Sequence, residues 1–382
     1  MAVNKFDNSM FDAGTIGTTA NKLLQMDGSA KIPAVDGSLL TGIPPSFTKN
    51  ASDPVITTNP SGGVGSLWAN TTSGNVYCCT DATAGENIWI NIGAGSGDIR
   101  LLYQGENYAY QAGGQVGSTS YNDINKYSLT SDGNATDVGN LTRVMNNGAG
   151  TSSPTYGYHM GGYWPSAGTS DIEKTQFSSD GNSVQITGDL VGVRRAHSSA
   201  TNKIYGYNAG GNGSASAIDK FLYSTEANST NVGTLHTGVQ DHSGHSSSTH
   251  GYCAGGNANP IQKWAFASDG TATDVGDLTY SSQGPLGSSS TDNGYACGGN
   301  GGTTNMNKFS FTSDGNATNV ASIDQRATGS GGSSTTHGYG AGGDKGGQQT
   351  NIFKYSFTTD GNSTSVGNLA YAAVYPWGQL QY

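Results

Sequence analysis

The chain has 382 residues, of which 34% are hydrophobic and 12% are charged, and its formal net charge is −10. The low shares of both classes, together with 60 glycines and 20 tyrosines, are typical of short strands joined by turns rather than of a disordered chain. The acidic charge excludes a basic stripe for nucleic acid, and no apolar run approaches the length of a membrane-spanning helix.

The N-terminal segment, residues 1–48, is predicted to have little structure of its own. Its start, MAVNKFDNSMFDAGTIG, lacks the apolar core of a signal peptide. Further on, LLQMDGSAKIPAVDGSLLTGI (Leu23–Ile43) carries apolar residues between Gly and Pro residues, so it can bury little surface within one chain. We expect association with other chains to stabilise this segment.

Residues 49–97 are predicted to form a small antiparallel β module. The stretches GSLWANTTSGNVYCC and NIWINIG combine β-branched and aromatic residues with turn signals. Cys78 and Cys79 are adjacent and lack the spacing of a zinc pair, and only two other cysteines, Cys253 and Cys297, occur in the chain. We therefore expect buried thiols, with no disulfide framework, no metal site and no cofactor.

From residue 98 to residue 382 the sequence repeats itself six times. Each copy holds a glycine doublet, a lysine and, in all but the third copy, an Asp-Gly pair; the third copy has Glu226-Ala227 instead. The copies lie near residues 107–155, 156–204, 205–250, 251–293, 294–337 and 338–382. The second glycines of the doublets are Gly114, Gly162, Gly211, Gly256, Gly299 and Gly343, and the lysines are Lys126, Lys174, Lys220, Lys263, Lys308 and Lys354.

Within a copy, the residue pattern indicates four short strands. An aromatic stretch precedes the glycine doublet, an alternating stretch such as INKYSL contains the lysine, and the Asp-Gly pair predicts a tight hairpin turn. A V-G-x-L stretch returns as the next strand, and the Ser/Thr-rich stretch adds a fourth. We therefore predict an all-β chain in which residues 98–382 form a six-bladed β-propeller, with a parallel solenoid as the alternative.

A propeller requires its two ends to meet in one blade. The C-terminal stretch AYAAVYPWGQLQY (Ala370–Tyr382) occupies the place of a next blade's first strand, and we predict that it pairs within the first blade. The stretch DIRLLYQG (Asp98–Gly105) competes for the same place.

The repeated residues are interpreted as structural. A glycine doublet lets two backbone segments approach closely, and a lysine stem can pack along a sheet while its ammonium meets a carbonyl, a carboxylate or a tyrosine ring. The alternatives are a ring of lysines that binds an anion, a glycine cradle for phosphate, and a calcium loop at DGNATD (Asp132–Asp137). No GK[ST] motif follows the doublets, and DGNATD lacks the length and the closing Glu of an EF-hand loop.

Ligand binding is predicted in the loops that differ between copies. These loops join the second strand to the third and one copy to the next, and variable loops on a rigid scaffold often carry binding sites. Their aromatic, amide and charged side chains suit a glycan. The candidate residues are Tyr163, Trp164, Arg194, Arg195, Gln240, Asp241 and His242.

Two resemblances guide the functional hypothesis. The glycine doublet that closes the second strand resembles the kelch repeat, although the loops are short and the lysine is an addition. Leu23–Ile43 and ASDPVITTNPSGGVGSLWANTTSGNVYCCTDATAGENIWINIG (Ala51–Gly93) resemble elements of tail-fibre proteins of tailed, especially marine, phages. This resemblance implies a virion protein assembled in the host cytoplasm, with an N-terminal anchor to other virion proteins, a trimeric state, and a C-terminal head that binds a host-surface glycan during adsorption.

Two other functions remain open. The first is a capsid or tail decoration or connector protein, whose propeller contacts other virion proteins. The second is a glycan-cleaving depolymerase, which needs two carboxylates in one cleft, and Asp241, Asp292, Asp324 and Asp344 are the acids outside the repeat pattern. A copper site of the kind found in kelch-type oxidases would draw on His197, His242 and His245, but no Tyr/His/His set stands out. We expect a non-enzymatic protein.

Overall fold

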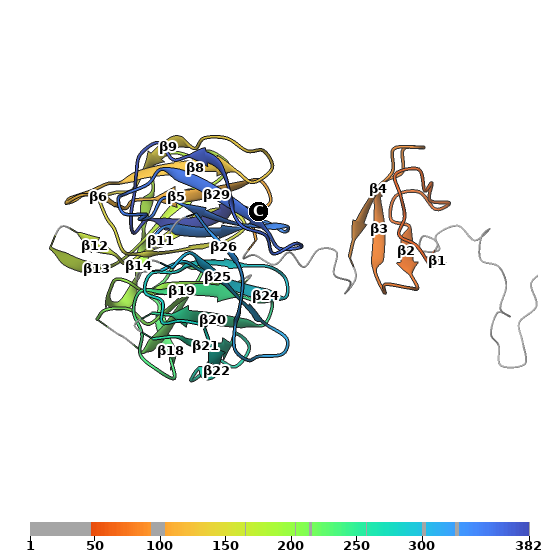
Figure 1. Ribbon diagram of the computed structural model, residues 1–382. Helices are drawn as coiled ribbons and strands as arrows, with labels where there is room; N and C mark the ends of the chain where they lie inside the picture. Colours follow the sequence, from red (N-terminus) through yellow and green to blue (C-terminus); the bar gives the residue numbers. More distant parts are fainter. Residues whose placement is uncertain are drawn as a thin grey trace, which may run out of the picture. The chain divides into compact units, whose positions relative to one another are not determined.

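The computed structural model describes residues 47–92 and 104–381, apart from residues 165, 203, 214–215, 257, 300–302 and 325–327. The chain divides into two compact units, Met1–Ile99 and Arg100–Tyr382 (Figure 1). All regular structure in the described residues is β-strand, so the all-β prediction is confirmed. Within those ranges no helix has the length and apolar character needed to cross a membrane. The predicted N-terminal segment lies outside the described residues, except for Phe47 and Thr48.

The first unit contains one four-stranded sheet in the order β1-β2-β3-β4. Its strands are β1 (Phe47–Asn50), β2 (Leu67–Asn70), β3 (Val76–Asp81) and β4 (Ile88–Asn91). The predicted antiparallel pairing is confirmed for β2, β3 and β4, and β1 adds a parallel pair with β2 that was not predicted. Residues 51–66 carry the chain back along one face of the sheet, so β2 starts at the same end as β1.

The second unit contains six sheets of the same construction, which we number 1 to 6. Sheet 1 consists of β31 (Trp377–Gln381), β5 (Tyr108–Ala112), β8 (Asp123–Ser128) and β9 (Thr136–Asn140). Sheet 2 consists of β10 (Ala149–Ser152), β11 (Tyr156–Met160), β13 (Ala167–Gln176) and β14 (Val184–Arg194). Sheet 3 consists of β15 (Ser198–Thr201), β16 (Tyr205–Ala209), β17 (Ala217–Leu222) and β18 (Thr230–Thr234).

Sheet 4 consists of β19 (His242–Ser246), β20 (His250–Gly255), β21 (Pro260–Ala265) and β22 (Thr273–Asp277). Sheet 5 consists of β23 (Leu286–Ser289), β24 (Asn293–Cys297), β25 (Asn305–Ser310) and β26 (Thr318–Ser322). Sheet 6 consists of β27 (Ser330–Ser333), β28 (His337–Ala341), β29 (Asn351–Ser356) and β30 (Thr364–Asn368). Of the short strands, β6 (Gln115–Val116) and β7 (Thr119–Ser120) pair with each other, and β12 (Tyr163–Trp164) pairs with β13 as a fifth strand of sheet 2.

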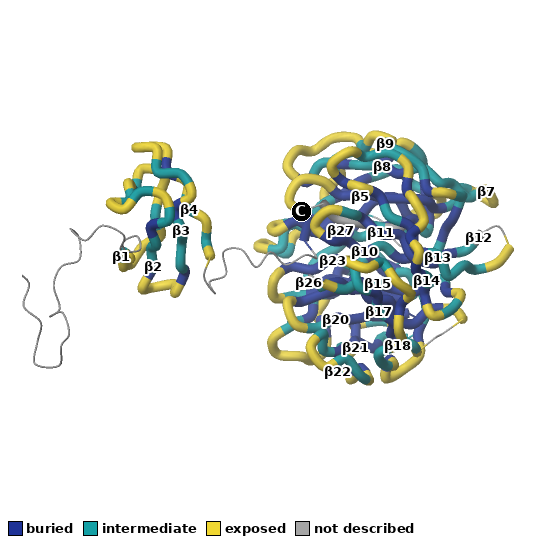
Figure 2. Tube along the Cα trace, turned by 180° about the vertical axis from the view of Figure 1, so that it is seen from behind, coloured by how far each residue is buried: buried dark blue, intermediate teal, exposed yellow. Residues whose placement is uncertain are grey.

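The first strands of the six sheets follow one another in a closed cycle. β10 lies beside β15, β15 beside β19, β19 beside β23, β23 beside β27, β27 beside β31, and β31 beside β10 again. All pairings inside the six sheets are antiparallel. Figure 2 shows that the strands of this unit are largely buried and that its loops are exposed.

The hydrophobic core is divided into six clusters, each of which joins two successive sheets. One cluster packs Tyr207 and Ile218 of sheet 3 against Trp264 of sheet 4. Another packs Tyr127 of sheet 1 against Tyr339 of sheet 6. The remaining four clusters join sheets 1 and 2, 2 and 3, 4 and 5, and 5 and 6. Each sheet therefore covers the apolar face of its neighbour, and the last sheet covers the first.

The C-terminal strand completes the first sheet, as the sequence predicted. β31 pairs antiparallel with β5, with Gln379 opposite Tyr110. Of the competing stretch, only Gln104 and Gly105 are described. Gln104 Nε2 donates a hydrogen bond to the Ser289 carbonyl at 3.1 Å, and Gly105 N–H donates to the Ser333 carbonyl at 2.7 Å. Gln104 and Gly105 therefore lie at the C-terminal ends of β23 and β27, outside sheet 1.

The predicted Asp-Gly hairpin turns are wrong in one respect, because the loops are longer than a tight turn. β13 ends at Gln176 and β14 begins at Val184, so residues 177–183 form the loop. Asp180 adopts a left-handed conformation with a φ of 53°, and Gly181 N–H donates to the Val138 carbonyl of sheet 1 at 2.8 Å. The loop is longer because it pairs with the neighbouring sheet as well as connecting its own strands.

Deletion of Trp377–Tyr382 tests the closure by β31. The truncation leaves β5 with an unpaired edge and removes a five-residue strand, whose hydrogen bonds contribute roughly 0.5–1.5 kcal/mol each. We expect the free energy of unfolding to fall by about 3 kcal/mol or more, measured by urea denaturation followed by circular dichroism. A truncated chain as stable as the unchanged protein would contradict the pairing.

Candidate functional site

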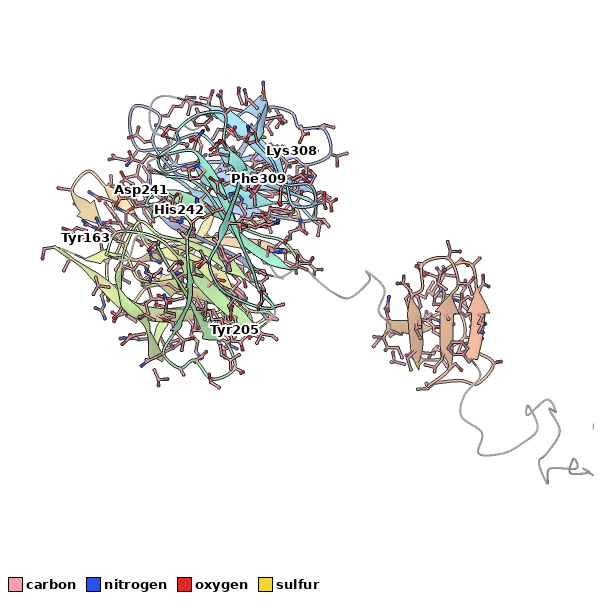
Figure 3. All side chains as sticks on the ribbon, turned by 90° about the horizontal axis from the view of Figure 1, so that it is seen from below. Tyr163, Tyr205, Asp241, His242, Lys308 and Phe309 are labelled. Atoms are coloured by element: carbon pink, nitrogen blue, oxygen red, sulfur yellow. The ribbon has the colours of Figure 1, made fainter. Side chains whose placement is uncertain are left out.

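The sheets of the second unit end in two different sets of loops. We call one end the repeated rim; it holds the loops between first and second strands and between third and fourth strands. We call the opposite end the variable rim; it holds the loops between second and third strands and the connections between sheets. In Figure 3, Tyr163 and Asp241 lie toward one end of the unit and Lys308 lies toward the other.

Six ion pairs between neighbouring sheets occupy the repeated rim. Lys126 on β8 contacts Asp180 of sheet 2, with Nζ and Oδ2 2.9 Å apart. At the end of the cycle Lys354 of sheet 6 contacts Asp132 of sheet 1, with Nζ and Oδ1 2.6 Å apart. The other four pairs, at 2.5 to 2.7 Å, are Lys174–Glu226, Lys220–Asp269, Lys263–Asp314 and Lys308–Asp360.

The position of these carboxylates explains why the third copy tolerates its different residue. Glu226, which replaces the Asp of the other copies, has a φ of 51° and still reaches Lys174 Nζ with both oxygens. Tyrosine rings hold the other side of several ammonium groups; Lys126 Nζ lies 4.2 Å from the centroid of the Tyr108 ring. A ring of lysines that binds an external anion would need free ammonium groups, whereas each of the six has a carboxylate partner.

The glycine doublets fix the connections at the variable rim. Gly162 N–H donates to the Arg194 carbonyl at 2.8 Å. A Cβ atom added at Gly161, whose φ is 59°, would lie 2.6 Å from the same carbonyl oxygen. In the same way Gly114, Gly211, Gly256 and Gly343 donate to carbonyls at the ends of their own sheets. The doublets therefore bring the backbone of a sheet's exit close to its second strand.

A closed cycle of backbone hydrogen bonds surrounds the centre of the variable rim. One residue from each connection between sheets donates its N–H to the carbonyl of the residue in the preceding connection, at 2.6 to 3.1 Å. All six residues have positive φ, from 53° to 71°. We call this set the axial ring. Its members are Asn147, Ala196, Asp241, Gly284, Thr328 and Tyr375.

Between the first strands lies a cavity of ≈190 Å³, lined by serine and glycine residues and by His197, His242 and His245. Burial lowers the pKa of His242 and that of His245 to about 4 and also lowers the pKa of His197, so the three rings are neutral at pH 7. His242 directly follows the axial ring, and its ring packs against Gly210, where a Cβ atom would lie 2.8 Å from Cε1. In the described part of the chain, no group of three or more His, Cys, Asp or Glu side chains could hold a metal ion.

A second pocket, of ≈460 Å³, lies at the variable rim over sheets 2 and 3. Its aromatic and polar side chains come from Tyr163, Ser166, Arg195 and Asn212. The rest of its lining consists of Ala167, Gly168, Gly192, Val193 and Gly213. The Arg195 guanidinium carbon lies 4.5 Å from the centroid of the Tyr163 ring. The backbone of Trp164 follows in β12, which pairs with β13, and its side chain lies outside the described residues. We call this site the rim pocket.

The predicted candidate residues divide into exposed and buried groups. Arg194, next to Arg195, is fully buried and pairs with the buried Asp219 through Nη2 and Oδ2 at 2.6 Å. His242 is also buried. Neither side chain is open to a ligand at the surface of the rim. Adjacent residues in an extended segment point to opposite sides, so one arginine enters the core and the other reaches the pocket.

Asp241 lies close to the rim pocket as a member of the axial ring. Gln283 Nε2 donates a hydrogen bond to its Oδ2 at 3.3 Å. Burial raises the pKa of Asp241, and the hydrogen bond from Gln283 and the charge of Arg195 oppose that increase. Gln240 precedes it in the same connection and is half-buried. Sequence reasoning missed Asn212 and Gln283, since neither the repeat pattern nor its residue type distinguishes them from other polar loop residues.

Of the remaining acids, Asp324 and Asp344 lie in loops of the variable rim, and Asp292 lies apart from them. Asp324 pairs with Lys345, and Asp344 Oδ1 accepts hydrogen bonds from the N–H groups of Gly346 and Gly347. Asp292 lies between β23 and β24, in a loop of the repeated rim.

The thiols of Cys79, Cys253 and Cys297 are buried, and burial raises the pKa of each.

No family model matches the chain, and no curated protein matches its sequence. The chain is similar to a solved structure described as "Structure of YjhT", with a TM-score of 0.53 and 12% sequence identity. The match covers 69% of this chain and 99% of that chain. At this level of identity the similarity concerns the β-rich fold alone.

Replacement of Lys308 by Met tests the ion pairs of the repeated rim. The Lys308 and Asp360 side chains are 24% and 27% exposed, so we expect the free energy of unfolding to fall by about 1 kcal/mol. Asp360→Asn should have a similar effect. The double variant should lose less free energy of unfolding than the two single variants lose together. The comparison is Arg194→Met, which leaves Asp219 buried without its partner and should cost about 3–5 kcal/mol. Urea denaturation measures each value, and equal losses at the two sites would contradict this ranking.

Acid should destabilise the protein through its buried histidines. Folding lowers the pKa of His245 from about 6.5 to about 4, so below pH 6.5 the unfolded chain binds a proton that the folded chain does not. We expect each such histidine to reduce the free energy of unfolding by up to about 1.4 kcal/mol per pH unit between pH 6.5 and pH 4. His245→Gln should reduce this pH dependence. A slope between pH 7 and pH 5 that is identical in the variant and in the unchanged protein would contradict the assignment.

Proposed function

We propose that the second unit is a six-bladed β-propeller, with one sheet per blade. The closed cycle of first strands, the core clusters between successive sheets and the completion of sheet 1 by β31 support this architecture. The six ion pairs and the axial ring repeat once per sheet, as expected for wedges around a common axis.

We further propose that the protein is a virion tail-fibre protein of a tailed phage, whose propeller binds a host-surface glycan during adsorption. The difference between the two rims carries this proposal. At the repeated rim the charged groups of the repeat are paired with one another. At the variable rim the rim pocket presents Tyr163, Arg195 and Asn212 together, on loops that differ from sheet to sheet. The chain also enters the unit at the repeated rim, through Gln104 and Gly105.

The chemistry of the rim pocket suits a sugar. A tyrosine ring offers an apolar face for C–H groups, while guanidinium and amide groups donate hydrogen bonds to hydroxyl or carboxylate oxygens. Three glycines in its lining, Gly168, Gly192 and Gly213, let a ligand approach the backbone there. One pocket of this size gives modest affinity, and several heads on one virion would raise the overall avidity. We expect no cofactor or metal in this function.

A connector or decoration role is the second candidate. Val191 and Val193 on β14 are 56% and 53% exposed, and Val193 lines the rim pocket. Exposed valines beside a pocket also suit contact with another virion protein. A virion reconstruction separates the two functions, because a connector's variable rim would be docked and a receptor-binding rim would be free.

Binding of the full chain to a glycan array tests the proposed function. We expect hits among bacterial surface polysaccharides, and Tyr163→Ala and Arg195→Ala should each weaken binding by about tenfold or more, which corresponds to roughly 1.4 kcal/mol. Tyr108→Ala is the matched control at the repeated rim, and it should bind like the unchanged protein. Equal binding of all three variants would exclude the rim pocket, and release of reducing ends from the bound polysaccharide would contradict the non-enzymatic role.

A further inference from the structure

The small sheet of the first unit has two unlike faces. Residues 51–66 cover one face, which carries Trp68 and Trp89. The Trp68 Nε1–H group donates to the Ser52 carbonyl at 2.9 Å, and the Trp89 Nε1–H group donates to the Thr58 carbonyl at 3.1 Å. The two rings meet edge to face with centroids 5.9 Å apart. This face therefore has its own cover within the unit.

The opposite face is apolar, and among residues 47–92 no segment covers it in the same way. The strand register places Phe47 opposite Leu67, Leu67 opposite Cys78, and Cys78 opposite Ile90, so one apolar row crosses all four strands. Residues two positions along a strand point to the same side, which extends this row in both directions. We call this set the open face. It consists of Phe47, Leu67, Ala69, Val76, Cys78, Ile88, Ile90 and Ile92.

The exposure of the open face is large for a unit of this size. Phe47 is 52% exposed, and Ile88, Ile90 and Ile92 are 53%, 45% and 58% exposed. With about 200 Å² for each fully exposed side chain, the open face presents on the order of 500 Å² of contiguous apolar surface. A four-stranded sheet with one covered face buries little core for its length, and units of this kind usually gain stability by association.

We propose that the open face packs against the open face of a second copy of this chain. In the described strands, the charged side chains on this side are Lys49, on the edge strand β1, and Asp81, which pairs opposite Ile88 as the last residue of β3. Two identical faces can therefore meet without burying like charges at their centre. The pair would bury about 1,000 Å² in total, which reaches the lower limit for a specific interface. The proposal concerns the first unit and does not depend on the proposed function of the second.

Mass measurement of the full chain by light scattering after gel filtration tests the proposal. We expect the unchanged protein to have a multiple of the single-chain mass of 39.1 kDa. Ile90→Lys puts a charge in the central row and should weaken the association at least tenfold, which shifts the protein toward the single-chain mass. Val64→Lys is the matched control, because Val64 is 63% exposed but is not a residue of the open face. It should keep the mass of the unchanged protein.

Chemical cross-linking gives a second measurement that needs no destabilising variant. Cys78 lies in the central row of the open face, whereas Cys79, Cys253 and Cys297 are buried. A bismaleimide should therefore link Cys78 of two copies in the unchanged protein, and Cys78→Ser should abolish the product. Fluorescence of Trp68 and Trp89 shows whether Ile90→Lys leaves the sheet folded. A single-chain mass for the unchanged protein, or a folded Ile90→Lys variant that keeps both its mass and its cross-link, would overturn the proposal.

Discussion

Each sheet of the second unit has two apolar faces and cannot be stable until both are covered. Successive sheets cover one another, as Tyr207 of sheet 3 meets Trp264 of sheet 4, but an open row of sheets would leave two faces in water. The cluster that contains Tyr127 and Tyr339 buries these two faces against each other, because it joins sheet 6 to sheet 1. The hydrophobic effect therefore demands a closed cycle, and the other repeated contacts follow from it. The ion pairs join neighbouring sheets at one rim, and the axial ring joins their connections at the other.

The convergence of six first strands explains the composition of the chain. At Gly287 of β23 there is no room for a side chain. A Cβ atom there would lie 2.7 Å from the carbonyl oxygen of Gly244 in β19, the first strand of the preceding sheet. Short hydroxyl side chains fill the remaining positions and join the strands. Thr201 N–H donates to Ser246 Oγ at 3.0 Å, and Ser289 N–H donates to Ser333 Oγ at 2.8 Å. The low hydrophobic content thus reflects the narrow centre of the unit, because the large apolar groups are needed only between sheets.

Much of the fold could be predicted from the sequence because the same physical demands act six times. The aromatic stretch, the lysine strand and the Ser/Thr strand recur, and the C-terminal stretch matched a missing first strand that β31 supplies. The parallel pairing of β1 and the longer loops after Gln176 were missed, since both depend on contacts with segments distant in sequence. The axial ring could not be predicted from the sequence, because its members share a backbone conformation and not a residue type. At the candidate site, Tyr163 and Arg195 could be chosen from the variable loops, but the opposite burial of Arg194 depends on Asp219 in the next sheet.

The strand β31 also has a consequence for biosynthesis. A ribosome makes β5 long before it makes β31, and the two strands of the same sheet are separated by most of the unit. The edge of β5 stays unpaired while the other sheets are synthesised. Pairing of β31 with β5 then closes a loop of more than 250 residues, and this step is slow because contacts so distant in sequence have a high entropic cost. Synthesis of β31 therefore decides when sheet 1 can be completed.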